Sequence, residues 1–422
     1  MKLTKNKLIT ALGSALCAAS ISASAGEVEV LHYWTSGGEA QSVAELQKLM
    51  KKKGHTWKDF AVAGGGGDNA TTVLKSRVVG GNPPTAAQVK GPSIQEWGDQ
   101  GVLASIDPVA KRDNWDSLLP EVVANVMKYE GKYVATPVNV HRVNWMWANP
   151  EAFKKAGASV PNNWDDFFVA ADKLKAAGIT PVAYGGQPWQ DFTVFESVVL
   201  GVGGSELYNQ VFVELDETAM KSAKMKESFD VFKRIKAYTD AGAPGRDWNT
   251  ATGMVIKGEA AMQFMGDWAK GEFTAAGKKP GVDYLCLPAP GTAGAFTFNI
   301  DSFIVFNQKD ESSKAALNDF AATIMEPEFQ EAFNLRKGSI PARLNMPRNN
   351  FDECALNSMD EFVSSASDKS LVPSVAHGMA VFDSVKGAME DVVTNFYNSD
   401  DMTSEAAMES FSKNVLAAKA AL

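Results

Sequence analysis

Short strand-like and helix-like segments alternate along the first hundred residues, and this alternation restricts the fold more than any other feature. Val28–Tyr33 is rich in β-formers, and Glu39–Lys53 places Val43, Leu46 and Met50 on one helical face. The alternation continues with a strand at 57–62, a turn at 64–67, a helix at 68–79, a strand at 86–89 and a helix that we expect Ser93 to cap. Such a βαβ series predicts an α/β fold with a largely parallel sheet.

The remainder of the chain predicts a second α/β lobe. Asn163 precedes Trp164-Asp165-Asp166, which suits a helix N-terminus because acids there meet the positive end of the helix dipole, and Thr180–Tyr184 is expected to form a strand. Helix and strand continue to alternate through 229–238 and 258–265. Beyond Ala315 the pattern is mostly helical, with breaks at 338–341 and near Pro373.

The N-terminal residues 1–25 have the organisation of a cleavable secretory signal. Three lysines precede an apolar stretch, and Ala23-Ser24-Ala25 is a small-residue cleavage site. A membrane anchor is the weaker alternative, because the apolar run at 8–21 is short for a span and contains hydroxyl residues. Ser14-Ala15-Leu16 also lacks the small residue expected before a lipidated Cys17. Cleavage after Ala25 predicts a periplasmic protein of 397 residues, enough for two lobes.

Charge and cysteine content narrow the choice of partners. Removing three lysines and no acids moves the formal charge from −9 to −12, which disfavours nucleic acid and anionic membranes. A neutral or mildly polar ligand fits this charge better. Cys286 and Cys354 remain in the mature chain; the compartment permits a disulfide, but their spacing does not establish one.

The chain lacks the common motifs of catalysis. There is no G-x-S-x-G, H-E-x-x-H or paired C-x-x-C sequence, and Gly64–Gly67 is followed by Asp68-Asn69 rather than by the Lys-Ser/Thr of a phosphate loop. The four histidines are His32, His55, His141 and His377, and they are too far apart in sequence to match the close spacing of metal ligands. We therefore expect no metal, no cofactor and no enzyme activity.

Aromatic and charged residues gather instead at the expected strand ends, where ligands of open α/β sheets bind. Tyr33-Trp34 precedes Glu39, and Trp268 follows Asp267, which we expect to cap the next helix. Aromatic rings pack against the apolar faces of a pyranose, while charged groups bind its hydroxyls. The pattern favours a sugar ligand, although each aromatic residue is also consistent with core packing.

The chain resembles the sugar-binding proteins of ATP-binding-cassette importers, and most of all the periplasmic glucose-binding group. The resemblance extends over nearly the whole mature chain. It is carried by Tyr33-Trp34 with Glu39, Gly80-Gly81-Asn82-Pro83-Pro84, Gln88-Val89-Lys90, Pro137–Arg142, Met265-Gly266-Asp267-Trp268, Asp301-Ser302-Phe303, Lys337–Ile340 and His377-Gly378. In some relatives, tryptophans occupy both positions that match Tyr33 and Trp34, and a histidine occupies the position that matches Lys90.

The resemblance implies a two-lobed periplasmic binding protein with an interlobe ligand cleft and a hinge. The lobes are expected at 26–138 with 298–340 and at 139–297 with 341–422, with crossings at 137–142, 295–300 and 338–343. The expected sugar-binding residues are Tyr33, Trp34, Glu39, Lys90, Trp268, Asp301, Lys337 and His377, with Gln88, His141 and Trp189 lining or supporting the cleft. The implied function is that of a monomeric receptor that captures a monosaccharide, expected to be glucose, and delivers it to a membrane permease.

Several alternatives remain open at the level of sequence. Asp301 also suits a structural salt bridge, Lys337 a solvated helix end, and His377 a loop histidine. The main rival function is a periplasmic glycoside hydrolase, with Glu39 and Asp301 as its two carboxylates. A receptor that presents its ligand to a sensor would use the same site with another partner.

Overall fold

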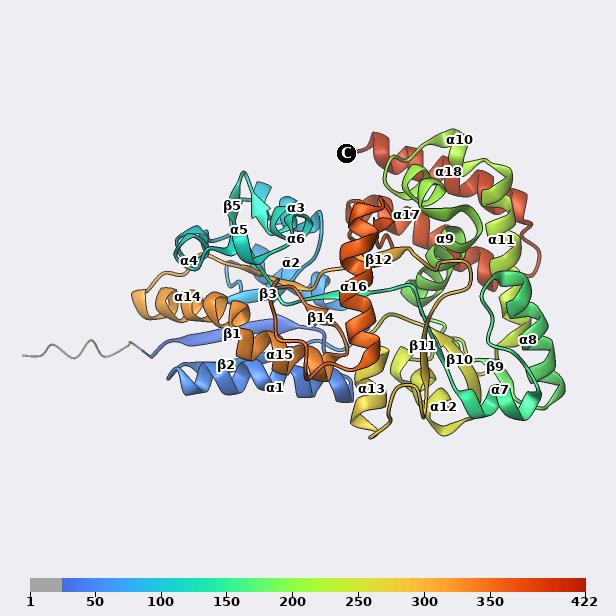
Figure 1. Cartoon of the computed structure of the whole chain (residues 1–422). Coiled ribbons are helices and arrows are strands. Elements are labelled where there is room, and N and C mark those ends of the chain that lie inside the picture. The colour runs from blue at the N-terminus through green and yellow to red at the C-terminus, as the bar shows by residue number, and fades with distance from the viewer. Residues whose placement is uncertain (1–24) are drawn as a thin grey trace, which may run out of the picture.

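The computed structural model describes residues 25–422, which form a two-lobed α/β protein (Figure 1). One lobe contains the N-terminal strands together with α14 (Glu311–Met325) and α15 (Pro327–Lys337), and the other contains most of the middle and the C-terminal end of the chain. Residues 1–24, and with them nearly all of the expected signal peptide and Cys17, lie outside the described residues. None of the helices in the described part is long and apolar enough to cross a membrane.

The first lobe is built on a five-stranded mixed sheet. Its strands, in spatial order, are β2 (Thr56–Ala61), β1 (Glu27–His32), β3 (Ala86–Gln88), β13 (Ser302–Val305) and β6 (Ala135–Pro137). The expected strands and helices at 28–89 are confirmed, and β2, β1 and β3 are parallel as predicted. The prediction of a largely parallel sheet is wrong for β13, which runs antiparallel to β3 and β6 because it enters from the connecting sheet described below.

Helices cover both faces of this sheet. They are α1 (Gly37–Lys52), α2 (Asp68–Val79), α3 (Ser93–Asp99), α4 (Asp107–Arg112), α5 (Trp115–Leu118), α6 (Glu121–Val126), α14 and α15, with a hairpin of β4 (Lys128–Tyr129) and β5 (Lys132–Tyr133). The expectation that Ser93 caps α3 is wrong. Pro92 occupies the cap position and Ser93 is already in the first turn, where its side chain makes no capping bond.

The second lobe has a four-stranded sheet of β11 (Leu285–Pro288), β8 (Trp145–Ala148), β10 (Ala260–Phe264) and β9 (Thr180–Val182). Its helices are α7 (Pro150–Ala156), α8 (Trp164–Ala176), α9 (Pro188–Phe212), α10 (Glu217–Met220), α11 (Ala223–Ile235), the 3₁₀ turn Lys236–Tyr238, α12 (Trp248–Lys257), α13 (Ala269–Ala275), α17 (Asp383–Asn398) and α18 (Ser404–Ala420). Helix α8 begins directly after Asn163 as predicted, and the Asn163 side chain caps it by accepting a hydrogen bond from the Asp166 N–H at 2.8 Å.

A third sheet joins the two lobes. It consists of β14 (Ile340–Pro341), β7 (Asn139–Arg142), β12 (Phe296–Asn299) and β15 (Leu371–Pro373), and α16 (Glu353–Ser367) packs beside it in the middle of the molecule (Figure 1). Strand β7 directly continues β6 after Val138, and β13 follows β12 after two residues. The chain therefore leaves and re-enters the first sheet through closely spaced turns. The three segments expected to cross between lobes contain β7, β12 and β14, which pair as neighbours.

Separate hydrophobic cores support the lobes. One core surrounds the first sheet and includes Val30 and Phe303, and another, rich in phenylalanine, includes Phe195 and Phe229 between α9, α11 and α18. A smaller cluster around Trp147 lies beneath the cleft side of the second sheet. Because the cores are separate, each lobe can stay folded while the two lobes move relative to each other.

A disulfide bond joins Cys286 in β11 to Cys354 at the start of α16, with the two Cα atoms 6.0 Å apart. It links residues 68 positions apart in sequence and connects the second sheet to the helix beside the third sheet. The pairing that the sequence left open is therefore present.

Glu390 on α17 is expected to make the stability of the protein depend on pH. Burial raises its pKa to about 7, and Lys386 only partly offsets this. A carboxyl whose pKa is raised by folding costs stability once the pH exceeds the unfolded value, and the full cost is reached above the folded value. Glu390→Gln is therefore expected to stabilise the protein by about 3 kcal/mol at pH 8, with no gain at pH 4.

Denaturant titrations of Glu390→Gln and wild type across pH 4–8 measure this effect. The exposed Glu206→Gln exchange on α9 serves as the matched control. A gain in stability that stays constant over the whole pH range would contradict the assignment to the ionised carboxylate.

Candidate functional site: an interlobe cavity

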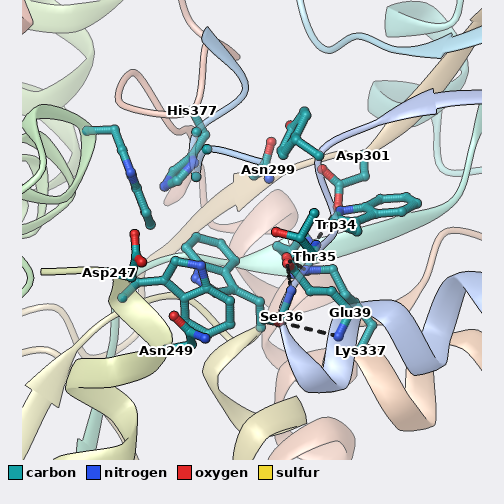
Figure 2. Close-up of a pocket in the computed structure, with 18 of the residues that line it drawn as sticks. Trp34, Thr35, Ser36, Glu39, Asp247, Asn249, Asn299, Asp301, Lys337 and His377 are labelled. Atoms are coloured by element: carbon teal, nitrogen blue, oxygen red, sulfur yellow. Dashed lines mark hydrogen bonds and ion pairs between the residues drawn. The ribbon is translucent and has the colours of Figure 1, made fainter. Parts of the chain in front are cut away.

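A cavity of about 340 Å³ lies between the lobes, beside the connecting sheet (Figure 2). Ten of the eleven residues expected at the cleft line this cavity: Tyr33, Trp34, Glu39, Lys90, His141, Trp189, Trp268, Asp301, Lys337 and His377. They come from segments up to 344 residues apart in sequence, so only the tertiary structure brings them together. Most follow a strand or precede a helix, as expected for ligand sites of α/β folds.

Gln88 does not line this cavity but supports two residues that do. Its side-chain oxygen accepts a hydrogen bond from the Tyr33 N–H at 3.2 Å, and its amide donates to Asp301 at 3.4 Å. The Tyr33 hydroxyl is buried and has no hydrogen-bond partner among the described residues. Gln88 thus holds a tyrosine and a carboxylate in place, which agrees with the supporting role expected for it.

Glu39 and Lys337 form a buried ion pair on the wall of the first lobe, with 2.9 Å between the carboxylate oxygen and the ammonium nitrogen (Figure 2). Glu39 also completes the capping box of α1, because its second oxygen accepts from the Ser36 N–H at 3.3 Å. The Lys337 ammonium lies 5.9 Å from the Trp34 ring centroid and 6.0 Å from that of Trp268. The alternative of a solvated lysine at a helix end, which the sequence left open, is therefore wrong.

Trp34 combines core packing with a place at the cavity. Its side chain is 2% exposed, and its ring contacts Phe303 edge to face at 5.5 Å and Phe333 at 5.2 Å. Trp268, 6% exposed, lies in the second lobe with its ring 4.8 Å from that of His377 and 5.2 Å from that of His141. The two indoles are thus held rigidly, one in each lobe.

His141 lies between two buried carboxylates and links the lobes. Its Nε2 is 2.8 Å from Asp301, and its Nδ1 pairs with Asp267. Burial opposes charge on the imidazole, but the two aspartates outweigh it and raise the pKa of His141. Burial likewise disfavours the Asp301 carboxylate, yet His141, Lys90 and Lys337 lower the pKa of Asp301. The two carboxylates therefore favour the protonated form of the imidazole between them.

The expectation that Asp267 caps α13 is wrong. Its carboxylate instead accepts a hydrogen bond from the Arg142 N–H at 2.9 Å and pairs with His141. Trp268 occupies the cap position of α13, which has no side-chain cap. The tertiary partners on β7 thus displace the local helix cap.

Lys90 and His377 add two basic groups with altered titration. Burial lowers the pKa of Lys90 to about 8, although the nearby Asp301 carboxylate opposes this shift. Burial, together with the charge of Lys90, lowers the pKa of His377, so its imidazole is neutral at pH 7. His377 Nε2 is 3.1 Å from the Thr193 hydroxyl. Lys90 supplies a hydrogen-bond donor, and the neutral imidazole makes either a donor or an acceptor available.

Several cavity residues were missed from the sequence. Asn299 ends β12 and has a buried side-chain oxygen without a partner in the described part of the chain. Asp247, Trp248 and Asn249 line the cavity at the start of α12, and the glycine run at 64–66, predicted only as a turn, forms part of its wall. A polar residue at a strand end and an Asp at a helix start were the available signals, but both are common in ordinary turns.

The geometry does not suit acid-catalysed hydrolysis. A glycosidase needs a protonated carboxyl whose pKa is raised, whereas the pKa of Asp301 is lowered, and Glu39 is held by Lys337 and two backbone N–H groups. Within residues 25–422, no three His, Cys, Asp or Glu side chains are grouped so as to hold a metal ion. The donors, acceptors and rings are arranged to hold a polar solute.

Comparisons with known proteins agree with this geometry. Residues 35–331 match the model of the family described as bacterial extracellular solute-binding protein. A probable sugar-binding periplasmic protein of Brucella melitensis is 46% identical over 418 residues, covering 97% of this chain and 99% of the relative. A glucose-binding protein of Saccharolobus solfataricus is more distant, at 25% identity over 57% of this chain and 45% of that protein.

Solved structures show the same fold. A chitin oligosaccharide binding protein superposes with a TM-score of 0.79, covering 94% of this chain and 99% of that one, at 22% sequence identity. The extent of the family match and the near full-length relative settle the family. The chain belongs to the bacterial extracellular solute-binding proteins, a family of receptors and not of enzymes.

Proposed function

We propose that this protein is a periplasmic receptor that binds a monosaccharide, with glucose as the expected ligand, and delivers it to the permease of an ATP-binding-cassette importer. The 46% identity to a probable sugar-binding periplasmic protein supports a sugar ligand. The choice of glucose rests on the matched residues around the cavity, since the named glucose-binding relative is distant. We infer a monomer that is released by cleavage after Ala25.

One observation carries the proposal. Tyr33, Asn299 and Lys90 line the cavity next to the rings of Trp34 and Trp268, and the Tyr33 hydroxyl and the Asn299 side-chain oxygen are buried without a hydrogen-bond partner in the described protein. Buried polar groups without partners are rare in native proteins. A pyranose matches this set, because its hydroxyls pair with the polar groups and its apolar faces contact the rings.

The interactions in such a complex are strong enough for micromolar binding. Hydrogen bonds to charged groups contribute about 1.5 to 3 kcal/mol each. Lys90, Asp301 and Lys337 therefore supply several kcal/mol, and ring contacts add to this. Micromolar binding requires about 8 kcal/mol after the cost of ordering the ligand.

Closure of the lobes around the sugar is the proposed signal to the permease. We place the lobes at 26–138 with 298–340 and at 139–297 with 341–422. Contacts across the cleft support closure: the Gly38 N–H donates to Glu272 at 2.9 Å, and Lys386 lies 3.6 Å from Asp68. A sugar that bridges the lobes shifts the population toward this closed form.

Calorimetric titration of the mature protein with glucose, mannose, galactose, xylose, maltose and cellobiose tests the proposal. We expect one-to-one micromolar or tighter binding of a monosaccharide that is recovered unchanged. Binding of none of these sugars would reject the proposed ligand class. Recovery of cleaved maltose or cellobiose would point to the hydrolase alternative instead.

A further inference from the structure

Trp189 of the second lobe lies directly against the glycine run of the first lobe. A Cβ atom added to Gly65 would lie 2.8 Å from Cζ2 of the indole, and one added to Gly66 would lie 3.1 Å from its Cγ. Both glycines and Trp189 line the interlobe cavity. Only glycine therefore allows the indole to rest on the backbone, and the resulting contact forms one wall of the cavity.

The indole has little freedom to move from this wall. Its Nε1 donates a hydrogen bond to the Gln187 side chain at 2.9 Å, and Gln187 in turn donates to Asp247 at 2.7 Å. The ring lies 6.4 Å from the ring of Trp268 and 5.8 Å from that of His377, and the residue is 5% exposed. Hydrogen bonds and ring contacts thus hold the indole against the glycines.

The volume of the cavity, about 340 Å³, lies near the lower end of the range of about 300 to 1,000 Å³ that is typical of small-molecule sites, which suits a single hexose. A disaccharide has about twice as many non-hydrogen atoms as a hexose. A second unit needs additional space that the wall of Trp189 and the glycines closes off on this side.

We propose that the contact of Trp189 with Gly65 and Gly66 limits the ligand to a single hexose unit. This inference rests on the proposed function and adds to it the contact that excludes a second sugar unit. A neighbouring cavity of about 260 Å³ shares Tyr33, Lys90 and His377 as wall residues. This neighbouring cavity is the other site available to a second sugar unit. Binding of a second sugar unit there would overturn the inference.

Exchange of the tryptophan provides the first test. Binding of glucose, mannose, galactose, maltose and cellobiose is measured by calorimetry. Wild type is expected to bind each disaccharide at least 100-fold more weakly than the best hexose, and this ratio of affinities is the quantity compared. Trp189→Ala is expected to reduce this ratio at least tenfold. Trp57→Ala, which removes an indole that does not line the cavity, serves as the control and should leave the ratio unchanged.

Exchange of the glycine provides the second test. Gly65 has no positive φ, so Gly65→Ala adds a methyl group against the indole without backbone strain. We expect at least tenfold weaker hexose binding in the wild-type background and less than a threefold change in the Trp189→Ala background. Gly387→Ala, whose added Cβ meets nothing within 4 Å, controls for the exchange itself.

The outcomes separate the inference from the proposed function. Wild type that binds a disaccharide as tightly as a hexose, or a Trp189→Ala variant with unchanged discrimination, would overturn the length limit while leaving a sugar receptor. An equal effect of Gly65→Ala in both backgrounds would exclude the indole contact as its cause. Failure of wild type to bind any of these sugars would reject the proposed function itself.

Discussion

Asp301→Asn is expected to weaken sugar binding by about 30-fold to several thousand-fold. Loss of one member of a buried, hydrogen-bonded charge pair costs 2 to 5 kcal/mol in binding, which corresponds to this range. Asp301 is 3% exposed, accepts from Gln88, and lies 2.8 Å from His141. The exchange removes a charged acceptor from the cavity and leaves the His141 imidazole with Asp267 alone.

Calorimetry on the folded variant measures the loss, with circular dichroism to establish that the variant is folded. The chain offers a matched control in Asp319→Asn. Asp319 pairs with the buried His55 at 2.9 Å, as Asp301 pairs with His141, but it lines neither cavity beside Tyr33. The control should bind as wild type does. An Asp301→Asn variant within fivefold of wild-type affinity would show that Asp301 is structural and not a ligand group.

Removal of the disulfide is expected to lower the free energy of unfolding by about 4 kcal/mol. A cross-link between residues 68 positions apart restricts the unfolded chain, and loop-closure entropy predicts a stabilisation of about this size. The bond joins β11 to α16 and neither cysteine lines the cavity. Stability should therefore fall while sugar affinity changes little.

Denaturant unfolding of Cys286→Ser/Cys354→Ser measures this prediction. Wild type treated with a thiol reductant should approach the stability of the double variant, and the double variant itself should not respond to the reductant. If reductant lowered the stability of both proteins equally, the effect could not arise from this disulfide. A large loss of affinity in the double variant would show that α16 positions the cleft.

The elements of the chain were predictable because their signals are local. The strands and helices between residues 28 and 89 match their expected ranges to within two residues, since apolar periodicity and glycine turns mark them. The start of the helix after Asn163 was predictable because the acids that mark it are also a local signal. The expected cap at Asp267 failed because a distant segment competed: its carboxylate bonds to β7 instead of its own helix. The expected cap at Ser93 failed by one position, because α3 begins at Ser93 itself and Pro92 takes the cap position.

The expected site residues were nearly all placed at one cavity, but their partners were not predictable. The ion pair of Glu39 with Lys337 joins residues almost 300 positions apart, and the group of His141 with Asp267 and Asp301 spans both lobes. Asn299 escaped notice because a single polar residue after a strand is common. No residue pattern indicates which distant side chain will satisfy a buried charge.

The sequence by itself determined the alternation of strands and helices, the two α/β lobes and the residue types that gather at strand ends. These depend on periodicity and turn chemistry, which act over a few residues. The tertiary structure alone decided the disulfide, the antiparallel entry of β13 and the seat of Trp189 on the glycine run. Each of these depends on the approach of segments far apart in the chain, and that approach is set by packing of the whole molecule.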